Sequence, residues 1–205
     1  MEKMNEKGRS MVEMLGVLAI IGVLSAGGLA GYSKAMFKHK LNSTIDQITM
    51  LVTNIRTMYG TQGNYTGLDG EAAYDLGIIP AVMTNDEGAT LTNPFKGGVS
   101  IALIDATDST ATSGNTGFTL TYSGLPAEAC IALATSDFGS GAGSGFIGVK
   151  ANNSKNTALQ IGGTGSKIGG DTGTSTYGEG QALQMSDAVT ACQGNEDSTV
   201  TWYFY

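Results

Sequence analysis

Few residues in this 205-residue chain could do chemistry by their type and spacing. Ser-His or Cys-His nucleophile pairs and most zinc sites need a suitably placed imidazole. The chain has a single histidine, His39, and it lies between two lysines in Lys38-His39-Lys40. We interpret His39 as part of a solvated basic face of a helix. Cys130 and Cys192 could be free thiols or a disulfide, depending on whether they leave the cytoplasm. Because the sequence has no phosphate-loop ending, nucleophile elbow or paired-cysteine metal spacing, it predicts no catalytic residue, cofactor or metal site.

Two weaker motifs lack the surroundings that their chemistry needs. The stretch 143–148 fits the spacing of a dinucleotide-binding fingerprint, but no clear strand precedes it and no convincing helix follows. Asp105, Asp108 and Asp171 could offer carboxylates to calcium, yet they do not fall at the ligand spacing of a calcium loop. We interpret them as solvated loop carboxylates.

Composition narrows the class of protein further. Eleven Lys and Arg against eighteen Asp and Glu give a formal charge of -7, opposite in sign to the basic surface that nucleic-acid binding needs. The 31 glycines follow no every-third pattern and there are three prolines, which excludes a collagen-like chain. We therefore expect one globular domain with an appendage, and no nucleic-acid partner.

The appendage is an apolar N-terminal segment. Residues 14–32 carry no formal charge, and as a helix they would cross about 28 Å of hydrocarbon. A cleavable secretory signal, cut after Ala30, is the alternative, but such signals have a shorter apolar region after a basic start, whereas the charges of residues 1–8 cancel. We interpret 14–32 as a membrane-spanning segment.

One carboxylate and five glycines distinguish this segment. Ionised Glu13 would cost about 2 to 3 kcal/mol deep in lipid, so it either has a cationic partner or lies near the headgroups in a first helical turn, where the helix dipole favours an acid. The glycines indicate either a face for close helix packing or the ordinary tolerance of membrane helices for glycine. They are Gly16, Gly22, Gly27, Gly28 and Gly31.

The string Gly8-Arg9-Ser10-Met11-Val12-Glu13, followed by the apolar run, resembles the start of a type IV prepilin. The resemblance implies a leader that a membrane peptidase removes between Gly8 and Arg9, with N-methylation of the new terminal amine on Arg9. Glu13 is then the fifth mature residue, and its implied role is to neutralise the terminal amine of a neighbouring subunit in a fibre. Because opposite charges in an apolar bundle are less costly as a pair, Glu13 would set the axial register. Arg9 departs from the family, whose first mature residue is usually apolar.

Beyond Tyr32 the apolar residues form one helical stripe. Since Gly60 is a credible stop, the pattern predicts one helix of about fifty residues from near Arg9 to Tyr59. A two-chain coiled coil would use the same positions, but we favour packing on a sheet because strands follow. The stripe consists of Leu41, Ile45, Ile48, Val52, Ile55 and Tyr59.

The remaining elements are short. Alternating apolar residues predict an antiparallel sheet with one face toward the helix. Helices are expected from Pro126, in the first turn, to Leu133, and from Ser186, as the N-cap, to Cys192 before Gly194. Irregular loops with one or two weak strands are expected over the Gly-rich and Ser-rich residues 139–180. The predicted strands are 99–104, 118–123 and 200–205.

The order of landmarks along this region is similar to that of type IVb pilins of the PilS-like group. Ala30, in place of the family's frequent helix-bending proline, points to the same branch. The resemblance implies a pilin fold of the α+β class, with a long N-terminal α-helix, half transmembrane, packed on an antiparallel β-sheet, and it implies a Cys130–Cys192 disulfide. The landmarks are Gly77-Ile78-Ile79-Pro80 with Met83, the stretch 91–99, Leu125-Pro126 before Cys130, and Cys192 before a terminal aromatic strand.

The resemblance as a whole implies a structural subunit of a type IV pilus, not an enzyme. It divides the chain into a leader (1–8), an assembly helix with its junction (9–40) and a globular head (41–205). The implied partners are copies of the same chain, the prepilin peptidase, the pilus assembly machinery and the inner membrane, with a host or recipient cell surface as a further candidate.

We expect a single-pass inner-membrane protein that becomes an extracellular fibre on a Gram-negative-type cell, for adhesion, aggregation or conjugative contact. One alternative is a minor pilin or a type II secretion pseudopilin, which shares the N-terminal features. The other is a signal-anchored periplasmic binding or adhesion protein that does not polymerise.

Overall fold

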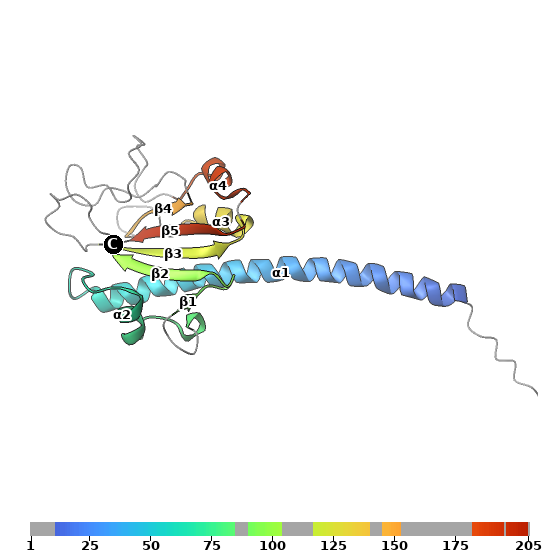
Figure 1. Ribbon diagram of the computed structural model, residues 1–205, viewed down its shortest axis with the longest axis horizontal. Helices are drawn as coiled ribbons and strands as arrows, with labels where there is room; N and C mark the ends of the chain where they lie inside the picture. The colour runs from blue at the N-terminus through green and yellow to red at the C-terminus, as the bar shows by residue number, and fades with distance from the viewer. Residues whose placement is uncertain are drawn as a thin grey trace, which may run out of the picture. The chain divides into compact units, whose positions relative to one another are not determined.

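A computed structural model places most of the chain, and its ribbon is drawn in Figure 1. The chain divides into two compact units, Met1–Lys40 and Leu41–Tyr205. Helix α1 (Met11–Tyr59) contributes to both units, and every other helix and strand described below belongs to the second. The described residues are 11–84, 90–103, 117–139, 145–152, 182–194 and 196–204.

The long helix confirms the prediction from periodicity. It ends at Tyr59. The next position takes glycine, Gly60, because a Cβ there would lie 2.7 Å from the carbonyl oxygen of Arg56. Its expected first residues, Arg9 and Ser10, lie outside the described part of the chain. The local pattern of the sequence was therefore sufficient to fix where this helix stops.

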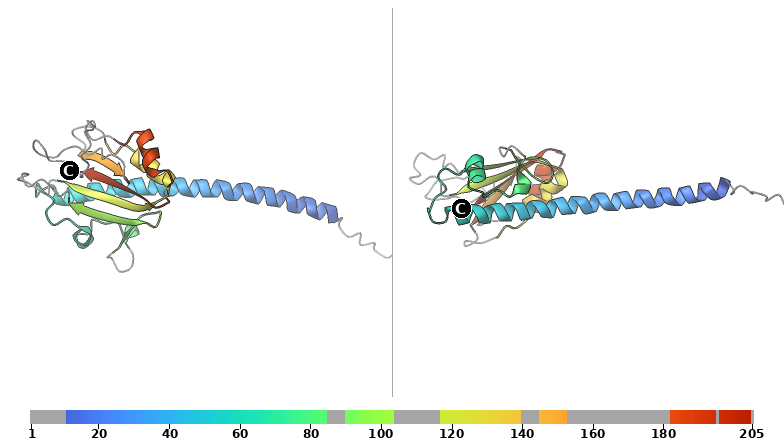
Figure 2. Two further views of the ribbon diagram at one scale, coloured as in Figure 1. Left: turned by 45° about the horizontal axis from the view of Figure 1, so that its top comes forward. Right: turned by 90° about the horizontal axis from the view of Figure 1, so that it is seen from below.

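In the described residues, five antiparallel strands form one sheet in the order β1-β2-β3-β5-β4, so β5 lies inside it (Figures 1 and 2). The three predicted strands are present with shifted ends. Strand β4 lies within the segment expected to hold one or two weak strands, and it begins inside the fingerprint-like stretch 143–148. The strands are β1 (Leu91–Thr92), β2 (Gly98–Leu103), β3 (Phe118–Leu125), β4 (Phe146–Ala151) and β5 (Ser198–Phe204).

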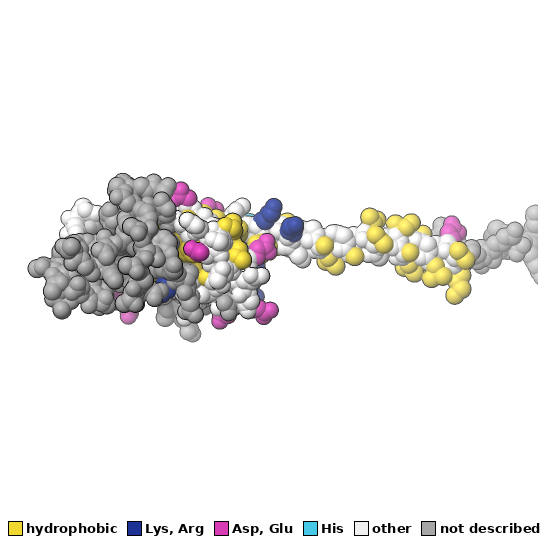
Figure 3. Space-filling model, turned by 90° about the horizontal axis from the view of Figure 1, so that it is seen from above, with side chains coloured by type: hydrophobic (Ala, Val, Ile, Leu, Met, Phe, Trp, Pro, Cys, Tyr) yellow, Lys and Arg dark blue, Asp and Glu magenta, His cyan; other side chains and the backbone are white. Residues whose placement is uncertain are grey.

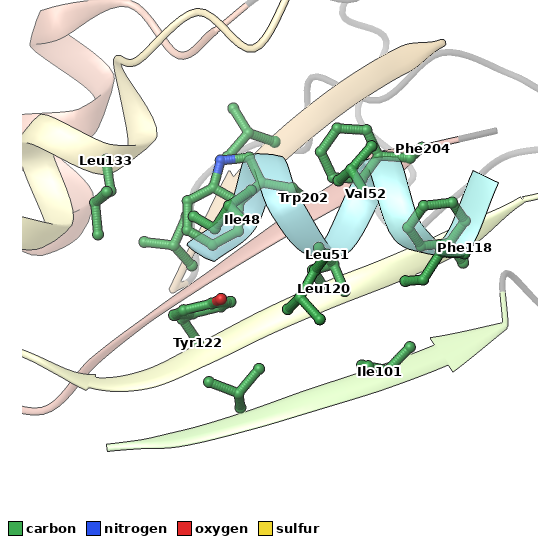
Figure 4. Close-up of a cluster of buried hydrophobic side chains, with 14 of the residues drawn as sticks. Ile48, Leu51, Val52, Ile101, Phe118, Leu120, Tyr122, Leu133, Trp202 and Phe204 are labelled. Carbon is green, nitrogen blue, oxygen red and sulfur yellow. The ribbon is translucent and has the colours of Figure 1, made fainter. Parts of the chain in front are cut away.

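The core of the second unit lies between one face of the sheet and the C-terminal half of α1 (Figure 4). A row of paired residues, Ile101, Leu120, Trp202 and Val149, crosses four strands and is buried. Packing on a sheet, rather than in a coiled coil, is thus confirmed for the stripe. A sheet is wider than a coiled-coil seam, so it covers further helix positions as well. The buried α1 residues are Thr44, Gln47, Ile48, Leu51, Val52, Ile55 and Tyr59, while Leu41 and Ile45 are half-buried.

Helices α3 (Ala127–Ala134) and α4 (Met185–Cys192) correct two details of the prediction. Pro126 is the N-cap of α3 and lies outside its first turn. Ser186 is not the cap of α4, because Gln184 holds that position and Ser186 lies inside the helix. The start is fixed by the preceding residue, Leu183, which is buried and whose N–H donates to the carbonyl of Ala134 at 3.0 Å. Two further short helices are α2 (Gly70–Asp75) and the 3₁₀ turn η1 (Ala81–Met83).

A tight turn joins β1 to β2 and rests on β3. The Asn93 side chain donates to the carbonyl of Ser123 at 2.8 Å and accepts from the N–H of Gly97 at 3.1 Å. A Cβ on Gly97 would collide with the carbonyl oxygen of Ser123 and would lie 2.8 Å from the Cα of Gly124. Two backbones therefore touch here, and β3 shifts its register against β5 between Tyr122 and Leu125.

A buried tyrosine provides a test of the core. Tyr122 packs edge-to-face on Trp202, with ring centroids 5.5 Å apart, and among the described residues its hydroxyl has no hydrogen-bond partner. Burial raises the pKa of Tyr122 above its ordinary value of 10. Because the pKa of Tyr122 is higher in the folded than in the unfolded state, the neutral hydroxyl's contribution to the free energy of unfolding is fully present below pH 10. This contribution is lost as the pH rises further.

We expect Tyr122→Phe to leave the free energy of unfolding at pH 7 unchanged or raise it by about 1 kcal/mol, since it removes an unpaired buried hydroxyl. Above pH 10 the variant should lose less stability than the wild type. Guanidinium unfolding in detergent micelles, followed by fluorescence of the single tryptophan, measures both effects, with exposed Tyr74→Phe as the control. A clear loss of stability at pH 7 would contradict the account.

Candidate assembly site

The described part of the first unit is one apolar helical surface. Residues 11–35 of α1 are all exposed, and the large apolar side chains up to Tyr32 are 52% to 81% exposed. Figure 3 shows hydrophobic side chains along this helix. In the described residues α1 is the one helix long and apolar enough to cross a membrane, with a mean hydropathy of 2.1 over its best window. So much apolar surface is stable only in hydrocarbon or against other apolar helices.

Glu13 lies in the first turn of α1 and is exposed. It is the only charged residue between Met11 and Ser33. Its position fits a first-turn acid that the helix dipole favours, and it equally leaves the carboxylate open to a cation from another molecule. Gly8 and Arg9, the predicted cleavage pair, lie outside the described residues, as do Asp105, Asp108 and Asp171.

Within the described residues, five glycines of α1 have no packing role. A Cβ built at Gly16, Gly22, Gly27, Gly28 or Gly31 would meet nothing within 4 Å. No contact among the described residues therefore requires glycine at these places. Both earlier interpretations, a face for close approach of another helix and simple tolerance in a membrane helix, agree with this.

The second unit is secured by the Cys130–Cys192 disulfide, which joins α3 to α4. Both cysteines are fully buried, and their bridge spans 62 positions of the sequence. The disulfide that the resemblance implied is therefore confirmed. Elsewhere, His39 is exposed on α1, as expected of a solvated basic face. In the part of the chain that the structure describes, no cluster of His, Cys, Asp and Glu could hold a metal ion.

Comparison with known proteins gives the family. A family model described as Bundlin matches residues 34–204. The chain belongs to the bundlin family. It is 27% identical over 204 residues to the "Major structural subunit of bundle-forming pilus" of Escherichia coli O111:H-, and 26% identical to the protein of the same description from Escherichia coli O127:H6 (strain E2348/69 / EPEC). Each alignment covers 100% of this chain and 96% of the relative.

Among solved structures, the chain is similar to a type IVb pilin from Salmonella typhi. The two share 18% sequence identity with a TM-score of 0.49, over 78% of this chain and 97% of that one. Membership of the bundlin family and the full-length similarity to structural subunits of bundle-forming pili confirm the pilin resemblance found in the sequence, and the long helix and antiparallel sheet are those that it implied.

Sequence reasoning missed one residue that holds the disulfide-linked end of this bundlin-family chain together. Asn152 has a positive backbone φ of 44°. Its Nδ2 donates to the carbonyl of Ala191 at 2.9 Å, and its Oδ1 accepts from the N–H of Thr199 at 2.7 Å. It thereby ties the end of β4 to both α4 and β5. Its partners lie 39 and 47 residues away, so no local pattern could have revealed it.

Removing the disulfide should destabilise the second unit. We expect Cys130→Ser with Cys192→Ser to lower the free energy of unfolding by about 2 to 4 kcal/mol, because the unfolded chain gains freedom. Guanidinium unfolding in micelles, read from the fluorescence of buried Trp202, measures the loss. A thiol reductant should lower the free energy of unfolding of the wild type to that of the variant. It should leave the free energy of unfolding of the variant unchanged. An equal effect of the reductant on both proteins would contradict the prediction.

Proposed function

We propose that this chain is the structural subunit of a type IV pilus. The observation that carries the proposal is the exposed apolar surface of residues 11–35 in a chain of the bundlin family. The full-length similarity to major structural subunits of bundle-forming pili supports it. Before assembly, the subunit is anchored in the inner membrane of a Gram-negative-type cell. It then polymerises with copies of itself into an extracellular fibre.

Processing and assembly follow from the N-terminal residues. In this proposal the prepilin peptidase cuts between Gly8 and Arg9, and the new amine on Arg9 is methylated. The pilus machinery then moves the helix from lipid into a bundle of identical helices. Apolar burial supplies cohesion in both places, but it has no direction and sets no register. Glu13 supplies the register by pairing with the terminal amine of a neighbouring subunit.

The test is the intact mass and N-terminal sequence of the protein from the envelope of its native host. We expect a chain that starts at Arg9, with or without one added methyl group. A start at Met1 or Gly31 would contradict peptidase processing and would indicate a plain anchor or an ordinary secreted protein. Abundance in sheared fibres then separates a major pilin from a minor pilin or pseudopilin, since only a major subunit dominates the fibre mass.

A further inference from the structure

The charges of this chain are segregated along the sequence. Residues 9–40 carry four basic side chains against one acid, a formal charge of +3. Residues 41–205 carry five Lys and Arg against fifteen Asp and Glu, a formal charge of -10. In an assembly of identical subunits, the basic segment of one copy therefore finds a partner of opposite charge in the head of another.

The basic side chains form a narrow face just beyond the apolar surface. Lys34 and Lys38 are exposed and lie one helical turn apart on α1, which places them on the same face with Cβ atoms about 6 Å apart. We name Lys34 and Lys38 the collar.

Helix α2 offers a surface with the opposite charge and the same spacing. Glu71 and Asp75 are exposed and also lie one turn apart. Tyr74 and Leu76, beside them, are each 46% exposed and add apolar surface next to the two carboxylates. We name these four residues the α2 face.

The α2 face is held rigidly on the second unit. Its opposite side buries Ala73 completely, and the side chain of Asp69 accepts from the N–H of Ala72 at 2.8 Å. The Asn54 side chain on α1 donates to the carbonyl of Ile78 at 2.8 Å and fixes the segment after α2. The two carboxylates are thus presented on a preorganised support, which lowers the cost of binding.

We propose that the α2 face binds the collar of a second copy of this chain; this inference rests on the proposed function and names one of its contacts. Charge and spacing are complementary between the two, because each offers two like charges one helical turn apart and the two pairs have opposite sign. The contact joins two different patches of the same molecule, so it is heterologous. Repetition of a heterologous contact generates a ring or an open helical filament, whereas one self-complementary contact stops at a dimer.

A charge exchange tests the contact. We expect Glu71→Lys with Asp75→Lys to lower the yield of sheared fibres about tenfold or more, because like charges then face each other. Lys34→Glu with Lys38→Glu should do the same. The chain with all four substitutions should return to within about threefold of the wild type, since the attraction is restored with reversed sign. The level of each variant in the envelope is measured first, and we expect it to equal that of the wild type.

The control is Glu128→Lys with Glu196→Lys, an equal change of charge at exposed positions away from α2, which should leave the yield near that of the wild type. Wild-type yield from the α2 variant, or no rescue by the exchange, would overturn the contact. So would a collar variant that is already depleted in the membrane, because its lysines would then act on lipid headgroups. Loss of fibres from the wild type itself would instead count against the proposed function.

Carbodiimide cross-linking of wild-type fibres provides a direct measurement. Fibres assembled from light and heavy isotope-labelled subunits should yield mixed-label cross-links between the collar lysines and the carboxylates of the α2 face. Cross-links with a single label only would place the contact within one chain and overturn the proposal.

Discussion

Cells that express only Glu13→Val should hold normal amounts of the protein in the membrane and release at least about tenfold fewer sheared fibres. The substitution makes residues 11–33 wholly uncharged, so insertion into lipid is unimpaired. In the proposed pairing, the substitution leaves the terminal amine of the neighbouring subunit without a counter-charge, and an unpaired buried charge costs about 3 to 5 kcal/mol. The subunit is then anchored correctly but lacks a preferred axial position.

Immunoblots of sheared and membrane fractions measure both quantities. Glu128→Val is the matched control, since it removes an exposed carboxylate from α3 and should leave fibre yield unchanged. Glu13→Gln separates charge from hydrogen bonding, and it should resemble Glu13→Val if charge neutralisation is the role. Normal fibre yield from Glu13→Val would exclude the register role.

Gly97→Ala is expected to destabilise the second unit by about 4 kcal/mol or more, or to prevent its folding. The new methyl group would meet the backbone of Ser123 and Gly124, and backbone atoms, unlike the end of a side chain, cannot turn aside. The turn held by Asn93 would have to leave β3, and β1 and β2 would move with it. Unfolding in guanidinium, read from Trp202 fluorescence, gives the change in free energy.

The neighbouring glycine supplies the control. A Cβ on Gly98 would meet the Oγ of Ser123 at 3.3 Å, which is a side-chain atom that can turn aside. Gly98→Ala should therefore cost less than about 1 kcal/mol. Equal losses from the two substitutions would show that the collision with backbone is not the cause.

Local patterns predicted the parts of the fold that depend on local physics. The stripe of α1 and its end at Tyr59 follow from a repeat within the helix itself, and the alternation of Phe118, Leu120 and Tyr122 revealed β3. Strand β4 was expected only as a weak strand within a long segment, because its partner β5 lies about fifty residues away. The start of α4 was misplaced because a distant bond, from Leu183 to Ala134, decides it.

Some residues of the candidate site could likewise be predicted from the sequence, and others could not. Glu13 could be singled out because a carboxylate in an apolar run is conspicuous in any fold. The α2 face could not, since the sequence does not reveal that Tyr74 and Leu76 remain exposed while Ala73 is buried. Asn152 was equally hidden, because its role depends on partners brought to it by folding.

The position of β5 has a consequence for export. The strand that connects β3 to β4 is the last element of the chain, and Cys192, one end of the disulfide, precedes it by only a few residues. As the polypeptide is threaded across the membrane, the sheet cannot be completed until residues 198–204 have emerged. A chain truncated before Ser198 would leave β3 and β4 unconnected, so β3 and β4 must remain unfinished as a sheet until this late strand arrives.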